Sequence, residues 1–541
     1  MTIFQRLTTF SVSTQTVEKI TAFLDKYATL IVLLVVTAVS IFAFSHYLQS
    51  GLGLAYNDAR SHLDIGRRVV EGLKPGMAQL GSVWLPLPHL LMVPTVWHDT
   101  MWHTGLAGAL QSMASFILTT VIVMKTLARL RVNRLGQVFG AIVFATNLNI
   151  VYLQSTAMTE LLLIATMTTG VYELIKYHEE GKLLTLIQAA AWIMLSTLVR
   201  YDGWFLLAWS TALIILYGLR TGGKTKAEGL FFLFCTVAGL GVVLWLLWNL
   251  LIFKDPLYFA FGPYSAHAQQ DQLDAAGVLL TKHNWWLALQ TYWYAMVYNV
   301  GILHILLGTL GAVLLFFDKK IPLNVRIATS ALLAPLVFNI IALYLGHSVL
   351  FVQNLNGDTW FNVRYGIMMM PSVAVFLGYL ASRFVNHRAL IIGLIVFVNI
   401  FAFLNADAVT IDDGRVGSSQ KNVSEVSSWL RDHAKNEPGF VLISAASHDA
   451  IIFSSELPMK KFIHEGTGKY WESATTSPDR WARWIVMRTN DENDSTFRLI
   501  NKTQQLYKYT RVASFPFADI YELNPEFVPN VATQPVYGRQ K

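Results

Sequence analysis

The chain has 541 residues, of which 54% are hydrophobic and 14% are charged, and its formal net charge at pH 7 is +7. A soluble globular domain contains about 25% charged residues, so this composition excludes an ordinary soluble enzyme, a fibrous repeat and a disordered chain. It predicts a polytopic α-helical membrane protein.

The charged residues are unevenly distributed along the chain. Residues 405–541 contain 16 Lys or Arg and 17 Asp or Glu, a density typical of a soluble domain, whereas residues 1–404 hold all of the basic excess. The single cysteine excludes an intrachain disulfide and a Cys-based metal site. We therefore predict, in chain order, a cytoplasmic N-terminal segment at 1–27, a membrane domain at 28–404, a soluble α/β domain at 405–525 and a disordered tail at 526–541.

Apolar stretches long enough to cross a hydrocarbon core about 30 Å thick recur through the membrane domain. They predict about eleven transmembrane helices, near residues 28–48, 104–124, 136–153, 157–175, 184–199, 203–219, 229–253, 286–316, 327–345, 366–382 and 389–404. With an odd number of spans, the two ends of the chain lie on opposite sides of the membrane.

Basic residues in the loops predict the orientation, because Lys and Arg are enriched on the cytoplasmic side. With the N-terminus inside, seventeen basic residues of the segment 1–404 are cytoplasmic and eight are outside. We therefore expect an integral protein of the plasma membrane whose C-terminal domain is extracytoplasmic. Because the basic residues serve this sidedness, the positive net charge does not indicate a nucleic-acid partner.

The first outer loop, residues 49–103, is long enough to be functional. It opens with Asp58, Arg60 and His62 directly after the first span, and it contains a rigid aromatic segment from Trp84 to His89. An ionisable residue at membrane depth indicates function by default, and for Asp58 we favour that interpretation. For Asp64, Arg67 and Arg68 we favour a solvated loop helix with neutralising pairs such as Asp64–Arg68.

Two further polar clusters fall on the predicted outer side. Glu160 lies at the turn between the third and fourth spans, where it is a candidate catalytic acid or a helix N-terminal acid favoured by the dipole. The other cluster contains residues of two separate segments, namely Arg200, Tyr201, Asp202, Arg364 and Tyr365. Arg200–Asp202 is either a local ion pair or part of a site, and an arginine at the start of an outer helix suits an anionic ligand.

The soluble tail is predicted to be a small α/β domain. Residues 422–435 have the periodicity of an amphipathic helix, and residues 440–444, 484–487 and 520–523 have that of strands. No nucleophile or metal-ligand spacing occurs in this segment of the sequence.

Together, the outer clusters predict a cavity open to the outside. Its carboxylates can deprotonate a hydroxyl, its arginines can stabilise a departing phosphate, and its aromatic side chains can stack on sugar rings. The sequence contains no Walker loop, His-rich metal motif or G-x-S-x-G motif. The sequence therefore indicates no particular cofactor, and no motif supports a divalent metal.

These residues resemble a known superfamily. The acid that opens the long first loop, the acid between the third and fourth spans, and the outer Arg-Tyr are similar to those of the GT-C glycosyltransferases. Within that superfamily, Asp58-Ala-Arg-Ser-His62, Gly66-Arg-Arg and Gly81-Ser-Val-Trp-Leu-Pro-Leu-Pro-His89 resemble the first loop of the protein O-mannosyltransferase and aminoarabinose-transferase branch. The chain departs from that pattern at the first acidic site, where it has Asn57-Asp58 in place of two adjacent acids.

The resemblance implies transfer of a sugar, with inversion, from a polyprenyl-phosphate-linked donor to a hydroxyl of a protein, lipid or glycan in the cell envelope. Asp58 would be the catalytic base, Glu160 the second acid, and Arg364 would face the donor phosphate. The expected substrate-binding residues are Arg60, His62, Trp84, His89, Arg200, Tyr201, Asp202, Arg364 and Tyr365. The alternative functions are a transporter or flippase of lipid-linked sugars and a scaffold whose tail binds partners.

Overall fold

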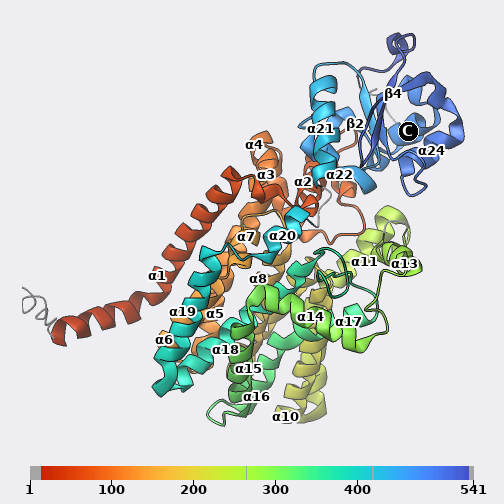
Figure 1. Ribbon diagram of the computed structural model, residues 1–541. Coiled ribbons are helices and arrows are strands. Elements are labelled where there is room, and N and C mark those ends of the chain that lie inside the picture. The colour runs from red at the N-terminus through yellow and green to blue at the C-terminus, as the bar shows by residue number, and fades with distance from the viewer. Residues whose placement is uncertain (1–13, 263–264, 417–419, 535–541) are drawn as a thin grey trace, which may run out of the picture.

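A computed structural model describes residues 14–262, 265–416 and 420–534. It contains a long helical bundle and, at one end of it, an α/β domain formed by the C-terminal residues (Figure 1). The segments predicted to be extracellular lie at the end of the bundle that carries this domain. Residues 1–13 of the predicted N-terminal segment lie outside the described residues.

The helical bundle follows the predicted spans in part. Six helices of the described chain are long and apolar enough to cross a membrane, or seven if a bent pair is included, so the predicted number of eleven is not confirmed. Several predicted spans correspond to shorter helices. The helices of the bundle are α1 (Thr14–Gln49), α5 (Leu106–Arg129), α6 (Arg134–Ala145), α7 (Leu148–Leu153), α8 (Glu160–Glu180), α9 (Leu183–Thr197), α10 (Asp202–Ala238), α11 (Leu240–Phe253), α14 (Trp285–Val300), α15 (Ile302–Phe317), α16 (Leu323–Thr329), η4 (Ser330–Leu333), α17 (Ala334–Tyr344), η5 (Val363–Met369), α18 (Met370–Arg383), η6 (Val385–His387) and α19 (Arg388–Leu404).

The long helix α10 is a hairpin of two legs. Gly223 has φ 73° and ψ −165°, a conformation that interrupts the helix and that glycine adopts readily. A Cβ on Gly218 would lie 2.5 Å from the Cα of Ala227, so the two legs are in backbone contact beside the turn. The predicted span 203–219 therefore corresponds to the first leg of α10. The predicted span 229–253 corresponds to the second leg together with α11.

The predicted span 286–316 is not one helix. The chain forms α14 and α15, which meet at an angle of 105° at Gly301, a residue with φ 95°. Both helices are apolar, so the sequence shows one continuous apolar run through the bend and gives no sign of it. In Figure 1, α14 runs across the bundle whereas α15 runs along it.

Close helix packing fixes η5 and α18 in the middle of the bundle. A Cβ on Gly140 of α6 would lie 2.9 Å from the carbonyl oxygen of Ala374, and one on Gly311 of α15 would lie 2.1 Å from that of Phe376. Small residues at such contacts let helix backbones approach closely in membranes. On another side of the bundle, α8 is buried from Glu160 to Val171. Arg364 lies on η5 and Glu160 lies on α8, so both side chains project from closely packed helices.

The first outer loop is ordered and packs on the bundle and on the C-terminal domain. The prediction that Asp64, Arg67 and Arg68 are solvated is wrong, because all three are buried. The Asp64–Arg68 pair does not form: Arg68 instead donates to both carboxylate oxygens of Asp449, at 2.8 and 3.2 Å. The loop contains η2 (Leu52–Leu54), α2 (Asn57–Val70), η3 (Met77–Leu80), α3 (Leu87–Val96) and α4 (Asp99–His103), and the next outer loop contains α12 (Tyr258–Phe261) and α13 (Ala266–Ala275).

The C-terminal domain contains a five-stranded sheet of order β2-β1-β3-β5-β4. Strand β1 pairs in parallel with both β2 and β3, whereas β5 pairs antiparallel with both β3 and β4. The predicted helix and three strands are present, and two strands were not predicted. The elements are α20 (Val409–Val416), α21 (Gln420–Ala434), β1 (Phe440–Ile443), α22 (Ala445–Ser454), η7 (Met459–Lys461), β2 (Phe462–Ile463), η8 (Glu465–Thr467), α23 (Lys469–Thr476), η9 (Pro478–Arg480), β3 (Ala482–Met487), α24 (Ser495–Thr503), η10 (Gln505–Lys508), β4 (Tyr509–Ser514), β5 (Asp519–Leu523) and η11 (Val528–Asn530).

The end of the chain differs from the predicted disordered tail. Val531 is buried in the core of the C-terminal domain, and the amide of Ala532 donates to the carbonyl of Arg480 at 2.9 Å. The apolar residues of this short segment thus complete the domain core. Residues 535–541 lie outside the described residues.

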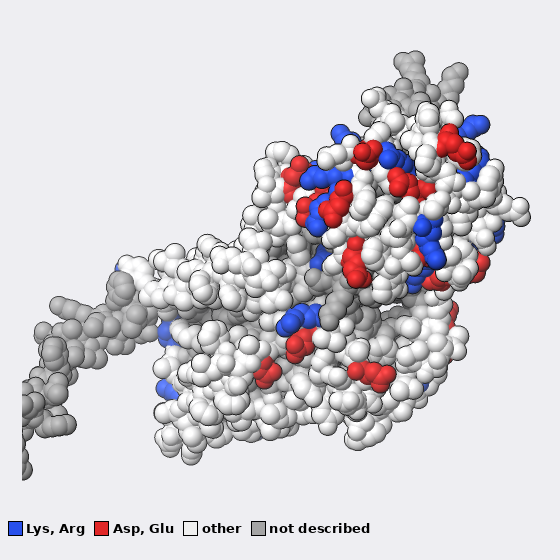
Figure 2. Space-filling view, turned by 45° about the horizontal axis from the view of Figure 1, so that its top comes forward, with Lys and Arg blue, Asp and Glu red and all other residues white. Residues whose placement is uncertain are grey.

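The surface shows the division of charge that the sequence predicts. In the face of Figure 2, Lys, Arg, Asp and Glu crowd the C-terminal domain, whereas most of the bundle surface is uncharged. A few charged side chains lie where the two parts meet.

Candidate active site

Arg364 is held in a turn that several buried groups fix. The turn begins at Asn362, whose backbone is left-handed with φ 54°. Asn299 of α14 donates to the carbonyl of Val363 at 2.7 Å, and a Cβ on Gly366 would lie 2.2 Å from the carbonyl of Ala295. The side chain of Arg364 therefore projects from a backbone that α14 holds in place.

The guanidinium of Arg364 lies among three carboxylates. Nη2 donates to Asp58 at 2.7 Å, Nε donates to Glu160 at 2.9 Å, and Nη1 lies 3.5 Å from Asp413. The Arg364 side chain is 6% exposed. Residues that are more than three hundred positions apart in the sequence thus meet at one buried cation.

Glu160 joins a second arginine to this group. It is the first residue of α8, and its Oε1 accepts from both Arg364 and Arg200 at 2.9 Å. Arg200 Nε also lies 3.5 Å from Asp202. The position of Glu160 at a helix N-terminus favours its negative charge, so its helix-terminal role and its place in the site coexist.

The four carboxylates differ in their access to solvent. The side chain of Asp58 is 44% exposed, whereas those of Glu160, Asp202 and Asp413 are nearly or fully buried. Asp58 is therefore the carboxylate of this group that an entering molecule can reach most easily. We call these four acids, with Arg200 and Arg364, the ion-pair cluster.

Tyrosine rings cover the guanidinium groups. The Cζ of Arg364 lies 4.9 Å from the centre of the Tyr56 ring, and that of Arg200 lies 4.5 Å from the centre of the Tyr365 ring. Such cation–π contacts stabilise the arginines and fix the planes of their guanidinium groups. They leave the donor groups of both side chains aligned within the cluster.

Asp413 and Tyr56 were not among the predicted site residues. The Tyr56 hydroxyl donates to Asp413 at 3.0 Å and to the carbonyl of Thr410 at 2.7 Å. Asn149 of α7 accepts from the amide and the hydroxyl of Thr410. These bonds tie α20 to the bundle and hold Asp413 beside Arg364. In the sequence, Asp413 lies in the charge-rich tail, where no pattern distinguishes it from its neighbours.

The predicted binding residues of the first loop form a second, adjacent group. Nδ1 of His62 and Nε2 of His89 lie 2.8 Å apart, and the His62 ring lies 4.3 Å from that of the half-exposed Trp84. Burial and the nearby arginines lower the pKa of His62 to about 3, so it is neutral at pH 7. Tyr201 donates to the carbonyl of Val83 at 3.3 Å, which connects this group to the loop before α10.

Arg60 contacts the start of the first loop and the C-terminal domain. Its Nε donates to the carbonyl of Leu54 at 2.9 Å, and its Nη1 donates to Ser454 of the C-terminal domain at 3.0 Å. The structure thus brings Asp58, Glu160, Arg200, Asp202, Arg364 and Tyr365 together and places Arg60 at the contact between the loop and the C-terminal domain.

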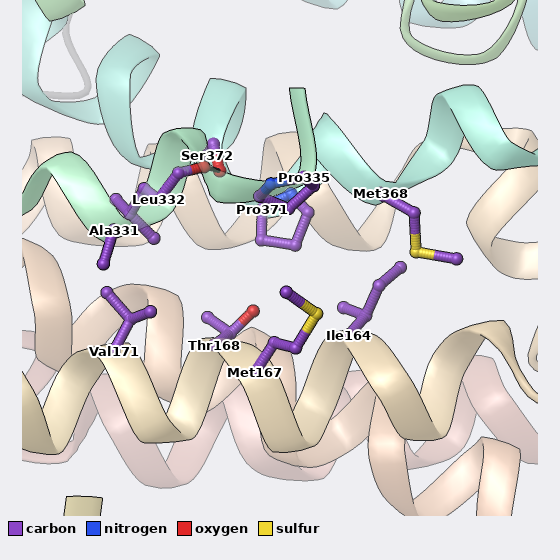
Figure 3. Close-up of a pocket in the computed structure, with 10 residues that line it drawn as sticks. All are labelled: Ile164, Met167, Thr168, Val171, Ala331, Leu332, Pro335, Met368, Pro371 and Ser372. Carbon is purple, nitrogen blue, oxygen red and sulfur yellow. Dashed lines mark hydrogen bonds between the residues drawn. The ribbon is translucent and has the colours of Figure 1, made fainter. Parts of the chain in front are cut away.

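A small apolar pocket lies between α8 and a group of helices that includes η5 and α18 (Figure 3). Ile164 follows Glu160 by four residues on α8, so the two side chains share a helix face. Met368 lies on η5, the 3-10 helix that also carries Arg364. Side chains from α8 face those from η4, α17, η5 and α18 across the pocket, which is lined by Ile164, Met167, Thr168, Val171, Ala331, Leu332, Pro335, Met368, Pro371 and Ser372.

The donor groups near the cluster do not form a recognisable metal centre. Within residues 14–262, 265–416 and 420–534, no three or more His, Cys, Asp or Glu side chains are grouped as metal ligands. The carboxylates of the cluster instead face guanidinium groups.

Known proteins share the architecture of this chain without detectable similarity to its sequence. The chain matches no protein-family model and no curated protein sequence. ArnT from Cupriavidus metallidurans, solved with undecaprenyl phosphate bound, aligns with a TM-score of 0.54 and 9% identity over 90% of this chain and 98% of that one. The chain has the GT-C fold.

A second GT-C protein supports this assignment of the fold. The oligosaccharyltransferase of Archaeoglobus fulgidus in its apo form aligns with a TM-score of 0.52 and 11% identity over 93% of this chain and 75% of that one. At such low identity the likeness concerns the fold, and the predicted GT-C architecture with a C-terminal α/β domain is confirmed at that level. The finer resemblance to one GT-C branch stays a prediction.

Proposed function

We propose that this protein is an integral-membrane glycosyltransferase that moves a sugar from a polyprenyl-phosphate-linked donor to an acceptor hydroxyl on the outer face of the membrane. The observation that carries the proposal is the ion-pair cluster, in which an accessible Asp58 lies 2.7 Å from a buried Arg364 within a GT-C fold. A base and a phosphate-binding cation are the two groups that such a transfer requires.

Asp58 is the proposed base. Its exposed carboxylate takes the proton of the acceptor hydroxyl as the oxygen forms a bond to the anomeric carbon. The bond from that carbon to the donor phosphate breaks on the opposite side, and its electron pair leaves with the polyprenyl phosphate. The configuration at the anomeric carbon is thereby inverted.

Arg364 and Arg200 are proposed to hold the donor phosphate and the charge that grows on it. Both guanidinium groups share Glu160, which is fully buried. We assign Glu160 to positioning the two arginines, in place of a direct role in proton transfer. Preorganised cations of this kind act without reorganisation during the reaction.

The apolar pocket between α8 and α18 is the proposed place for the first part of the lipid tail. Its lining residue Ile164 lies one helical turn after Glu160 on α8. A phosphate bound at the arginines would direct its prenyl chain from there between the helices. The bound undecaprenyl phosphate of the ArnT structure supports a donor of this class. His62, Trp84 and His89 are proposed to contact the sugar or the acceptor.

The orientation forms part of the proposal. The excess of cytoplasmic basic residues predicts that the N-terminus is inside. The ion-pair cluster and the C-terminal domain then both face the outside of the plasma membrane, where a protein, lipid or glycan of the cell envelope supplies the acceptor.

Mass spectrometry of cells tests the function. We expect a strain that lacks this protein to accumulate one polyprenyl-phosphate-linked sugar and to lose the same sugar from one glycoconjugate, and the wild-type gene to restore both. An unchanged set of lipid-linked sugars and glycoconjugates would contradict the proposal. Retention of the donor on the inner leaflet would instead favour a flippase.

A further inference from the structure

The exposed side chains of α14 and α15 differ in kind although the two helices are consecutive. The exposed face of α14 consists of Trp285, Trp286, Leu289, Trp293, Tyr294 and Tyr298. The exposed large side chains of α15 are Ile302, Leu306, Leu310, Val313 and Phe317. The change from tryptophan and tyrosine to aliphatic residues and phenylalanine occurs at Gly301, which is also the point of the bend.

This change matches the two chemical layers of a bilayer. Trp and Tyr are enriched at the membrane–water interface, where the ring contacts acyl chains and the polar atom reaches the headgroups. Aliphatic side chains favour the hydrocarbon core. Because α14 meets α15 at 105°, a bilayer crossed by α15 has α14 lying nearly parallel to its surface. The 16 residues of α14 include no Asp, Glu, Lys or Arg, so neither face is built for water alone.

The opposite face of α14 supports the turn that carries Arg364. Asn299 and Tyr292 donate to the carbonyls of Val363 and Tyr365, at 2.7 and 3.3 Å. Gly366 is in backbone contact with Ala295. One helix therefore presents aromatic side chains outward and holds η5 with its inner face.

We propose that the Trp and Tyr face of α14 lies in the headgroup layer of the outer leaflet, with bilayer phospholipid as its partner, and thereby fixes the depth of the turn that carries Arg364. The continuity of this face with the aliphatic face of α15 at Gly301 argues for lipid over a protein partner. For the proposed transfer, this places Arg364 close to the level at which the phosphate of a lipid-linked donor lies. The membrane contact itself does not depend on that function.

Depth-dependent fluorescence quenching tests the proposal. The sole cysteine, Cys235, is changed to serine, and single cysteines are introduced as Trp286→Cys and Trp293→Cys on α14. Leu310→Cys on α15 and Tyr507→Cys, at an exposed site of the C-terminal domain, are the controls. Each variant is labelled at its cysteine with an environment-sensitive fluorophore and placed in phosphatidylcholine–phosphatidylglycerol nanodiscs. Three quenchers are compared, namely a lipid with a nitroxide near its headgroup, a lipid with a nitroxide near the end of its acyl chain, and iodide in the water.

The expected result separates the three positions. The α14 probes are quenched about twofold more by the shallow than by the deep nitroxide, because the two labels differ in depth within a core about 30 Å thick. The α15 probe shows the reverse order, and the C-terminal probe responds to iodide alone. The proposal would be overturned if the α14 probes behaved like either control, or if no quencher reached them because protein covers them. The readout needs no sugar transfer, so its outcome is independent of the proposed function.

Discussion

Asp413 Oδ2 lies 3.5 Å from Arg364 Nη1, although α18 and α19 separate the two residues along the chain. Asp413 belongs to α20, the short helix that follows the last bundle helix and leads into the rest of the C-terminal domain. Through this contact, and through the bond from Tyr56 to Asp413, the connection to the C-terminal domain becomes part of the wall of the proposed site.

This relationship predicts that Asp413 positions Arg364. Asp413→Asn weakens one of the three acidic contacts of the guanidinium and is expected to lower the rate of transfer about tenfold, which corresponds to about 1.4 kcal/mol. Asp412→Asn is the matched control, because Asp412 is adjacent and exposed. Equal activities of the two variants, in membranes with equal amounts of protein, would contradict the role.

Arg364→Lys tests the need for a guanidinium. A lysine keeps the positive charge but cannot reach Asp58, Glu160 and Asp413 at once, because its ammonium is a point charge on a flexible stem. We expect the variant to lose transfer by at least about a hundredfold. The comparison with Arg131→Lys, at an arginine distant from the cluster that donates to the carbonyl of Lys320, controls for the substitution itself. A rate close to that of the wild type would remove Arg364 from the proposed phosphate site.

Filling the apolar pocket is expected to weaken donor binding. Thr168→Phe places a ring among the pocket residues, and Thr168→Val keeps the size of the side chain. We expect the KM for the lipid-linked donor to rise about tenfold in the first variant, a loss of about 1.4 kcal/mol, with little change in the second. An unchanged KM for a folded Thr168→Phe protein would place the lipid tail elsewhere.

The contact between the first loop and the C-terminal domain gives a stability prediction. Burial raises the pKa of Asp64, and the nearby Asp449 carboxylate raises it further, so the uncharged Asp64→Asn should change stability little. Asp449→Asn leaves Arg68 buried without its carboxylate, which costs about 3 kcal/mol. Thermal unfolding in detergent should show a clearly lower Tm for Asp449→Asn than for Asp64→Asn, and the reverse order would contradict the assignment of the charged pair.

The positions of Asp58, Glu160, Arg200 and Arg364 illustrate what the sequence predicts well. Each is an ionisable residue at a predicted outer span end, and the topology alone requires the four to lie on one side of the membrane. Their mutual distances depend on helix packing, for example on glycine contacts such as that of Gly311, which no local pattern reveals. That is why Asp413 was missed: its approach to Arg364 depends on how α20 folds back, held by Asn149.

The bend at Gly301 shows a different limit of sequence interpretation. A count of hydrophobic residues that includes Trp and Tyr makes residues 286–316 one apolar run, so α14 and α15 merge into one predicted span. Their separate environments become visible when the exposed faces are known. The burial of Asp64, Arg67 and Arg68 has a similar cause, because the partner of Arg68 comes from the C-terminal domain, 381 residues later.

The central claim is that Asp58 is the base of a glycosyl transfer, and Asp58→Asn tests it most directly. Membranes of a strain that lacks the protein supply the lipid-linked donor and the acceptor, the purified protein is added, and mass spectrometry follows the consumption of donor and the release of polyprenyl phosphate. Asp255→Asn, a change in an outer loop remote in sequence from the cluster, is the control. We expect Asp58→Asn to lower the rate by at least about a hundredfold while it keeps the Tm of the wild type. Full transfer by a folded Asp58→Asn protein would contradict the account.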